Sequence, residues 1–119
     1  TRETVDVGVA YGSDVELVRE ILIDIAKNHE KVLKIPDPTV LFMDFADSSL
    51  NFRLAFSLNN SFEARFVKSD LRFAIDKAFR DKNVTIPFPQ RDVHFYPTTQ
   101  LEKQPKKTEE KSKEIRKEE

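Results

Sequence analysis

Three stretches of the chain have the residue pattern of β-strands. Valines recur at every second position in "TVDVGV", which is the period of a strand with one buried face. Residues 50–58 alternate in the same way, and their apolar face consists of Leu50, Phe52, Leu54, Phe56 and Leu58. Residues 40–45 are apolar on both faces, so a core on one side explains only half of this strand. A further short strand is expected in "DVHFY", residues 92–96.

Two other stretches have the period of helices. The first is expected to start at the capping-box pair Ser13 and Glu16 in "SDVE" and to end before Pro36. Its apolar stripe comprises Val18, Ile21, Leu22 and Ile25. The second runs roughly over residues 62–82. The stripe that it is expected to turn toward the sheet comprises Val67, Leu71, Ala74, Ile75, Ala78 and Phe79.

The order strand, helix, strand, strand, helix, strand predicts an α+β fold. With right-handed connections it corresponds to the ferredoxin-like βαββαβ two-layer sandwich, in which one sheet carries two helices on one face. We expect this domain to occupy residues 1–96. From Leu101 onward the chain has seven Lys or Arg and six Glu but only two large apolar residues. Residues 97–119 are therefore expected to be a disordered charged tail, because such a segment buries too little surface to offset its ordering entropy.

Composition excludes several classes of function. The 119 residues include no cysteine, which rules out disulfides, thiolate zinc sites and cysteine nucleophiles. The formal net charge of -1 gives no general attraction to nucleic acid or to anionic membranes. No apolar run approaches the roughly 20 residues that span a bilayer. Because the chain begins at Thr1 rather than at a methionine, we expect it to be a fragment of a longer protein.

A polar cluster, Asp47-Ser48-Ser49, separates two apolar strands in "VLFMDFADSSLNFRLAF" and has two interpretations. A nucleophilic site would need a base oriented toward a serine, and nothing in this stretch places a histidine or lysine there. A hairpin turn is favoured, because Asp and Ser side chains accept hydrogen bonds from nearby backbone amides. His29 and His94 are far apart, lack metal-ligand spacing, and are expected at the surface or at an edge. We therefore predict no catalytic, cofactor-binding or metal-binding residues and no enzymatic activity.

The second helix carries more apolar surface than a two-layer domain can bury. Phe62, Phe66 and Phe73 lie within about 40° of one another around the helix axis, roughly opposite the core stripe. Because exposed aromatic patches are usually contact sites, we interpret these residues as a protein interface. The alternative is that Phe62 lies in the preceding loop and covers one of the other two. Val40 and Phe42, taken as the surplus face of their strand, are the second candidate surface for self-association. The polar face of residues 50–58 offers no aromatic stacking platform, so RNA binding is not expected.

Three segments, taken in order, resemble a known family. They are "VGVAYGSDVELVREIL", "ADSSLNFRLAF" and "IPFPQRDVHF", and they resemble the C-terminal cytoplasmic α/β domain of the small-conductance mechanosensitive channel family. The similarity covers residues 4–96. Its most specific parts are "DSSLN" at 47–51 and "IPFPQ" at 86–90, followed by Asp92 and Val93.

The resemblance implies a non-enzymatic, homoheptameric channel of a bacterial inner membrane, which opens under membrane tension in osmotic stress. Copies of this domain would enclose a cytoplasmic vestibule that ions and small solutes cross, and the domain would reach the membrane only through a segment upstream of Thr1. No cofactor or nucleic-acid partner is implied. In this family a short strand after the α/β domain closes a small parallel barrel. In this chain that strand would have to lie between Pro97 and Pro105. The alternative is a free-standing ferredoxin-like regulatory or ligand-binding module.

Overall fold

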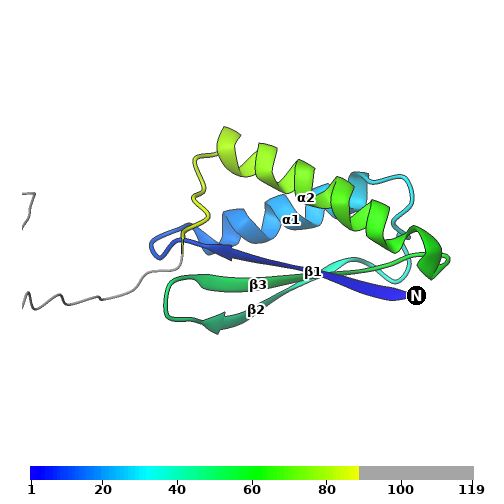
Figure 1. The fold of residues 1–119 in the computed structure, drawn as a ribbon, viewed down its shortest axis with the longest axis horizontal. Coiled ribbons are helices and arrows are strands. Elements are labelled where there is room, and N and C mark those ends of the chain that lie inside the picture. Colours follow the sequence, from blue (N-terminus) through cyan, green and yellow to red (C-terminus); the bar gives the residue numbers. More distant parts are fainter. Residues whose placement is uncertain (89–119) are drawn as a thin grey trace, which may run out of the picture.

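The computed structural model describes residues 1–88. They form, in order, β1 (Arg2–Val9), α1 (Val15–Asn28), β2 (Thr39–Phe45), β3 (Leu50–Ser57), the 3-10 turn η1 (Ser61–Glu63) and α2 (Ala64–Asp81). The strands form one antiparallel sheet in the order β1-β3-β2, and both helices cover the same face of it (Figure 1). The α+β class is thus confirmed, whereas the described residues show βαββα and not the complete βαββαβ order. The predicted strand at 92–96 and the domain boundary at residue 96 lie outside the described residues.

The hydrophobic core lies between the sheet and the two helices. Val5 and Val9 of β1 pair with Leu54 and Leu50 of β3, so the apolar faces of both strands point the same way. All four side chains are buried, and Phe56 of β3 is fully buried with them. Full burial of one such side chain contributes roughly 1.5–3 kcal/mol. This buried face fixes the register, because a slip by one residue would turn every one of these side chains toward solvent.

Helix α1 starts one residue later than the capping box predicts. Asp14, rather than Ser13, is the N-cap, and its Oδ1 accepts hydrogen bonds from the backbone N–H groups of Glu16 and Leu17. Ser13 instead donates its hydroxyl hydrogen to the Ala10 carbonyl oxygen at 2.6 Å and so closes the turn after β1. The predicted stripe faces the core, and it consists of the buried Val18, Ile21 and Leu22 and the partly buried Ile25.

His29 follows α1 and connects it to α2. Its Nδ1 accepts a hydrogen bond from the backbone N–H of Lys31 at 3.1 Å, so in the neutral ring the proton is on Nε2. That Nε2 lies 2.8 Å from Asp70 Oδ2 on α2. The side chain is 13% exposed, which places His29 at an edge between surface and core, at the C-cap of α1. Tertiary packing places it between the two helices, and His94 lies outside the described residues.

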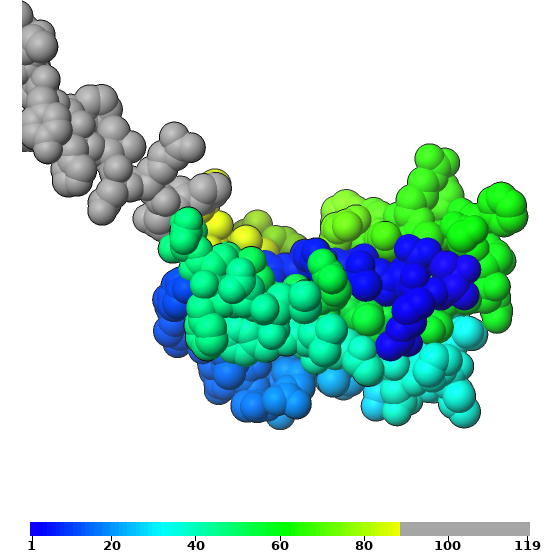
Figure 2. All heavy atoms as spheres, turned by 90° about the horizontal axis from the view of Figure 1, so that it is seen from below, coloured from blue at the N-terminus to red at the C-terminus, as the bar shows by residue number. Residues whose placement is uncertain are grey.

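The two helices cover different strands. α1 packs against β2 and β3, whereas α2 packs against β1 and α1 and, within residues 1–88, has no contact with β2. The opposite face of the sheet carries no helix, and the strands themselves form the surface seen from below (Figures 1 and 2). The arrangement therefore leaves the outer side of α2, and the free edge and outer face of β2, without cover from the described part of the chain.

Candidate subunit interface

Helix α2 has one buried and one exposed apolar stripe. The side chains buried against the core are Val67, Leu71, Ile75 and Phe79. On the other side Phe66 is 60% exposed and Phe73 is 77% exposed, and Phe62 in the preceding turn η1 is 89% exposed. We call these three residues the α2 phenylalanine stripe. The guanidinium carbon of Arg65 lies 4.8 Å from the centre of the Phe66 ring, a cation–π contact that keeps one cation beside the stripe.

The sequence assigned two alanines to the buried stripe of α2, and only one of them lies against the core. Ala78 packs against the core in part, whereas Ala74 is exposed. At about 100° per residue, Ala74 lies at the margin of the buried stripe, where its short side chain does not reach the core.

Strand β2 places Val40 and Phe42 on the core side of the sheet. They pair with Leu54 and Phe52 of β3, whose side chains are buried. Val40 packs against the core, and the Phe42 ring stacks on Phe52 with centroids 4.7 Å apart. The expectation that these residues face away from the core is therefore wrong. Because β2 is an edge strand, Phe42 is still 41% exposed, and its contact with a neighbouring subunit stays a prediction.

A bulge in β2 decides where its other apolar residues lie. The register against β3 shifts between Phe42 and Asp44, which leaves Met43 without a partner residue and brings the Phe45 ring to 4.9 Å from the Phe42 ring. Leu41 pairs with Arg53 on the face without helices. We call Leu41, Phe42, Met43 and Phe45 the β2 edge. The sequence shows that β2 is apolar on both faces, but it does not reveal the bulge, so Leu41, Met43 and Phe45 were missed as surface candidates.

The turn between β2 and β3 contains Asp47, Ser48 and Ser49. It is closed by a hydrogen bond from the Ala46 N–H to the Ser49 carbonyl oxygen at 2.9 Å. The Ser49 hydroxyl donates to Asn51 Oδ1 at 2.6 Å, so it binds a strand side chain and not an amide of the turn. The Tyr11 hydroxyl donates to the Ala46 carbonyl oxygen and fastens the turn to the loop after β1. These bonds give Ser49 a structural role in the turn.

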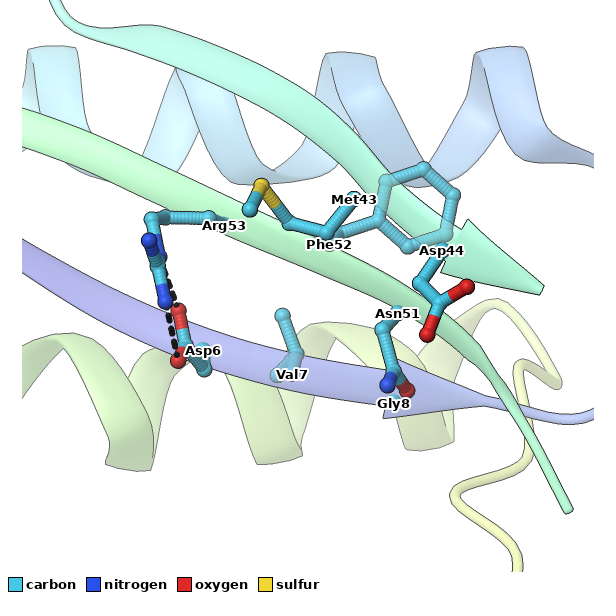
Figure 3. Close-up of a pocket in the computed structure, with 8 residues that line it drawn as sticks. All are labelled: Asp6, Val7, Gly8, Met43, Asp44, Asn51, Phe52 and Arg53. Atoms are coloured by element: carbon cyan, nitrogen blue, oxygen red, sulfur yellow. Dashed lines mark hydrogen bonds and ion pairs between the residues drawn. The ribbon is translucent and has the colours of Figure 1, made fainter. Parts of the chain in front are cut away.

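A shallow hollow lies on the outer face of the sheet, beside the bulge of β2 (Figure 3). One side is the bidentate ion pair of Arg53 with Asp6, in which Nε–Oδ1 is 2.8 Å and Nη2–Oδ2 is 3.1 Å. The hydrogen bonds from Arg53 lower the pKa of Asp6, and the carboxylate raises the pKa of Arg53. Asn51 lies beside Gly8 on the other side. The lining contains no Ser, Thr, Lys or His side chain, and within residues 1–88 no three His, Asp or Glu side chains gather as metal ligands.

Comparison with known proteins places the chain in a family. A family model described as "Mechanosensitive ion channel MscS, C-terminal" matches residues 3–86. The chain is 36% identical over 90 residues to the small-conductance mechanosensitive channel of Edwardsiella ictaluri, which covers 76% of this chain and 31% of that protein. It is 34% identical over 96 residues to the mechanosensitive channel MscK of Escherichia coli, which covers 81% of this chain and 9% of that protein.

A solved structure agrees with these relatives. The chain is similar to the closed-state crystal structure of Helicobacter pylori MscS, with a TM-score of 0.67 and 31% identity over 82% of this chain and 38% of that chain. The fold and these similarities define a domain of a mechanosensitive channel protein. The chain belongs to the MscS family and corresponds to its C-terminal domain.

Family membership bears on the prediction that the protein has no enzymatic activity. The named relatives are channels and not enzymes, which agrees with the expected lack of enzymatic activity. None of the helices in residues 1–88 combines the length and the apolarity needed to cross a membrane. The chain spans 31% of the Edwardsiella protein and 9% of MscK, so most of each relative has no counterpart in it.

Proposed function

We propose that this chain is the cytoplasmic domain of a tension-gated small-conductance mechanosensitive channel in a bacterial inner membrane. Seven copies would enclose a vestibule below the pore, through which ions and small solutes pass. The observation that carries the proposal is the family match over residues 3–86. The exposed α2 phenylalanine stripe supports it, because these side chains need a cover that the described part of their own chain does not supply.

The distribution of apolar surface suits a ring. In a cyclic assembly each subunit uses two different surfaces, since contacts between successive subunits are heterologous. The α2 phenylalanine stripe and the β2 edge are two such surfaces, and they belong to elements that do not touch each other. Aromatic residues are enriched in the buried centres of protein interfaces, and the α2 phenylalanine stripe has this composition. In this function the domain has an architectural role and performs no chemical step.

The coding sequence upstream of Thr1 gives a direct test. A channel subunit requires apolar segments of about 20 residues ahead of this domain, and we expect three of them. Their absence would contradict the channel proposal and would favour the free-standing regulatory or ligand-binding module. The outer-face hollow between β1 and β2 is the observation that supports this second candidate.

Introducing negative charge into the α2 phenylalanine stripe tests whether it is a subunit contact. We expect Phe66→Asp combined with Phe73→Asp to weaken assembly of the complete channel while the domain stays folded. Both side chains are exposed, so the free energy of unfolding should change by no more than about 1 kcal/mol, or about 0.5 kcal/mol for each substitution. Chemical cross-linking of the channel in membranes measures assembly as the distribution of oligomer sizes.

A control is Ala74→Asp, which introduces one of the two negative charges on the same helix at an exposed position outside the stripe. This variant should assemble like the unaltered protein. Normal assembly of the double phenylalanine variant would show that the stripe is not a subunit contact.

A further inference from the structure

The two exposed apolar surfaces differ in charge. Around β2, residues 35–52 include Asp37, Asp44 and Asp47 but no Lys or Arg. Asp44 and Asp47 are exposed, and neither forms an ion pair with a residue of the described part of the chain. The β2 edge is therefore an apolar strip with unpaired negative charge at its C-terminal end, while the Arg2 guanidinium lies at its start, where it donates to Thr39 Oγ1.

One side of the α2 phenylalanine stripe carries positive charge, whereas Asp70, which is paired with His29, lies on its other side. Arg65 and Arg72 are seven residues apart, so they lie on the same side of the helix, two turns from each other. Within residues 1–88 neither guanidinium has a carboxylate partner in an ion pair, whereas the nearby Lys68 is paired with Glu3 at 3.1 Å. Arg72 lies close enough to Asp6 to contribute to lowering the pKa of that carboxyl, after the dominant hydrogen bond from Arg53. The basic row thus runs between the phenylalanines and the side of α2 that faces β1.

We infer that the α2 phenylalanine stripe of one copy of this chain docks on the β2 edge of the next copy, with Arg65 and Arg72 facing Asp44 and Asp47. The inference rests on the proposed ring assembly and specifies which surfaces meet. Each surface offers aromatic side chains that are suited to an interface centre, and the two sets of charges are opposite in sign. A contact of β2 with β2 would instead bring the like charges of Asp44 and Asp47 together.

Separate positions of the two surfaces make a head-to-tail contact possible. α2 lies over β1, β2 is the opposite edge of the described sheet, and the two elements have no contact within residues 1–88 (Figure 1). A copy that offers its β2 edge to one neighbour therefore keeps its stripe available for another. Contacts of this kind propagate and close into a ring when the rotation allows it.

Disulfide trapping tests the pairing, since the natural chain has no cysteine. We would prepare the 119-residue chain with Met43→Cys and, separately, with Phe66→Cys, both at exposed positions. The two variants would be mixed in equal amounts with one of them isotopically labelled, then oxidised, and the dimers would be weighed by mass spectrometry. We expect the mixed dimer to exceed either homodimer several-fold. The control uses Glu20→Cys, at an exposed position of α1, in place of Met43→Cys. It should give no such excess of mixed dimer.

Charge reversal separates complementary charges from general apolar adhesion. We expect Arg65→Glu with Arg72→Glu in the Phe66→Cys chain to lower the yield of mixed dimer. Asp44→Lys with Asp47→Lys in the Met43→Cys chain should then restore it. The yield should also fall with added salt, because the screening length shortens from about 10 Å at 0.1 M to about 3 Å at 1 M. Circular dichroism of each variant checks that the domain is folded.

Two results would overturn this pairing. A mixed-dimer yield no higher than the Glu20→Cys control would do so, as would charge reversal without effect. A predominance of Phe66→Cys homodimers would show that the stripe meets itself. In that case the pairing fails, while ring assembly is judged separately by Phe66→Asp with Phe73→Asp in the complete channel.

Discussion

At the β2–β3 turn a few residues hold the chain in place. Ser49 donates to Asn51 Oδ1, and a Cβ on Gly8 would lie only 3.0 Å from Ser49 Oγ. Gly8 is thus a position where the absence of a side chain lets the turn pack over β1. The sequence indicates a turn at Asp47-Ser48-Ser49, but it does not give the partners. These partners depend on the pairing of β1 with β3, which sets Gly8 opposite Asn51.

A double-mutant cycle measures the bond between Ser49 and Asn51. We expect Ser49→Ala to lower the free energy of unfolding by about 1 kcal/mol, the usual contribution of one such hydrogen bond. The loss should be smaller when Asn51 is already alanine, because the two side chains act as one unit. Urea unfolding of the four chains gives the coupling. Strictly additive losses would show that the bond contributes nothing.

Among the elements, α1 is a helix that was predicted correctly but whose N-cap residue was not. Ser13 and Asp14 are adjacent, and both residue types cap helices well. The turn after β1 uses Ser13 for a bond to the Ala10 carbonyl, which leaves Asp14 to cap. The apolar stripe of α1 was predictable because it depends on spacing alone. The choice of cap was not, since it depends on how the preceding strand ends.

The cap assignment can be tested within α1. We expect Asp14→Ala to lower the free energy of unfolding by about 1 kcal/mol and to speed hydrogen exchange at the Glu16 and Leu17 amides. Ser13→Ala is the matched control, because it should leave exchange at these two amides unchanged. Faster exchange at the same amides in Ser13→Ala would show that Ser13 is the N-cap residue of α1. Amide exchange followed by NMR distinguishes these outcomes.

Across the whole molecule, ion pairs connect elements that are distant in sequence. Lys31, after α1, pairs with Glu63 in η1, and Lys68 of α2 pairs with Glu3 of β1. The hydrogen bond from Lys31 lowers the pKa of Glu63 and raises the pKa of Lys31. Sequence alone could not pair these charges, because each partner is brought to the other by the packing of the helices on the sheet.

The ion pairs Asp6–Arg53 and Glu63–Lys31 predict how the stability of the fold responds to acid. The folded-state pKa values of Asp6 and Glu63 lie below their ordinary values of 3.8 and 4.5. Their contribution to stability is therefore fully present above those ordinary values and is lost as pH falls through the lower folded-state values. Urea unfolding midpoints should fall in this range, and less steeply for Asp6→Asn with Glu63→Gln. Because both pairs are exposed, the effect should be small and should shrink with added salt. An equal slope for the variant would exclude these carboxyls as the cause.

The sequence by itself determined the strands and helices of residues 1–88, the buried face of β3 and the surplus of phenylalanines on α2. These features follow from the spacing of apolar residues along the chain, which is a local property. The tertiary structure decided that Val40 and Phe42 lie on the core side, that Leu41 and Met43 lie outside, and that His29 sits between the helices. The reason is that other elements surround these residues. The side of β2 that each residue occupies depends on its register against β3, and the environment of His29 depends on how α2 packs on α1. The same packing leaves four charged side chains near these surfaces without an ion pair to the described part of the chain, namely Arg65, Arg72, Asp44 and Asp47.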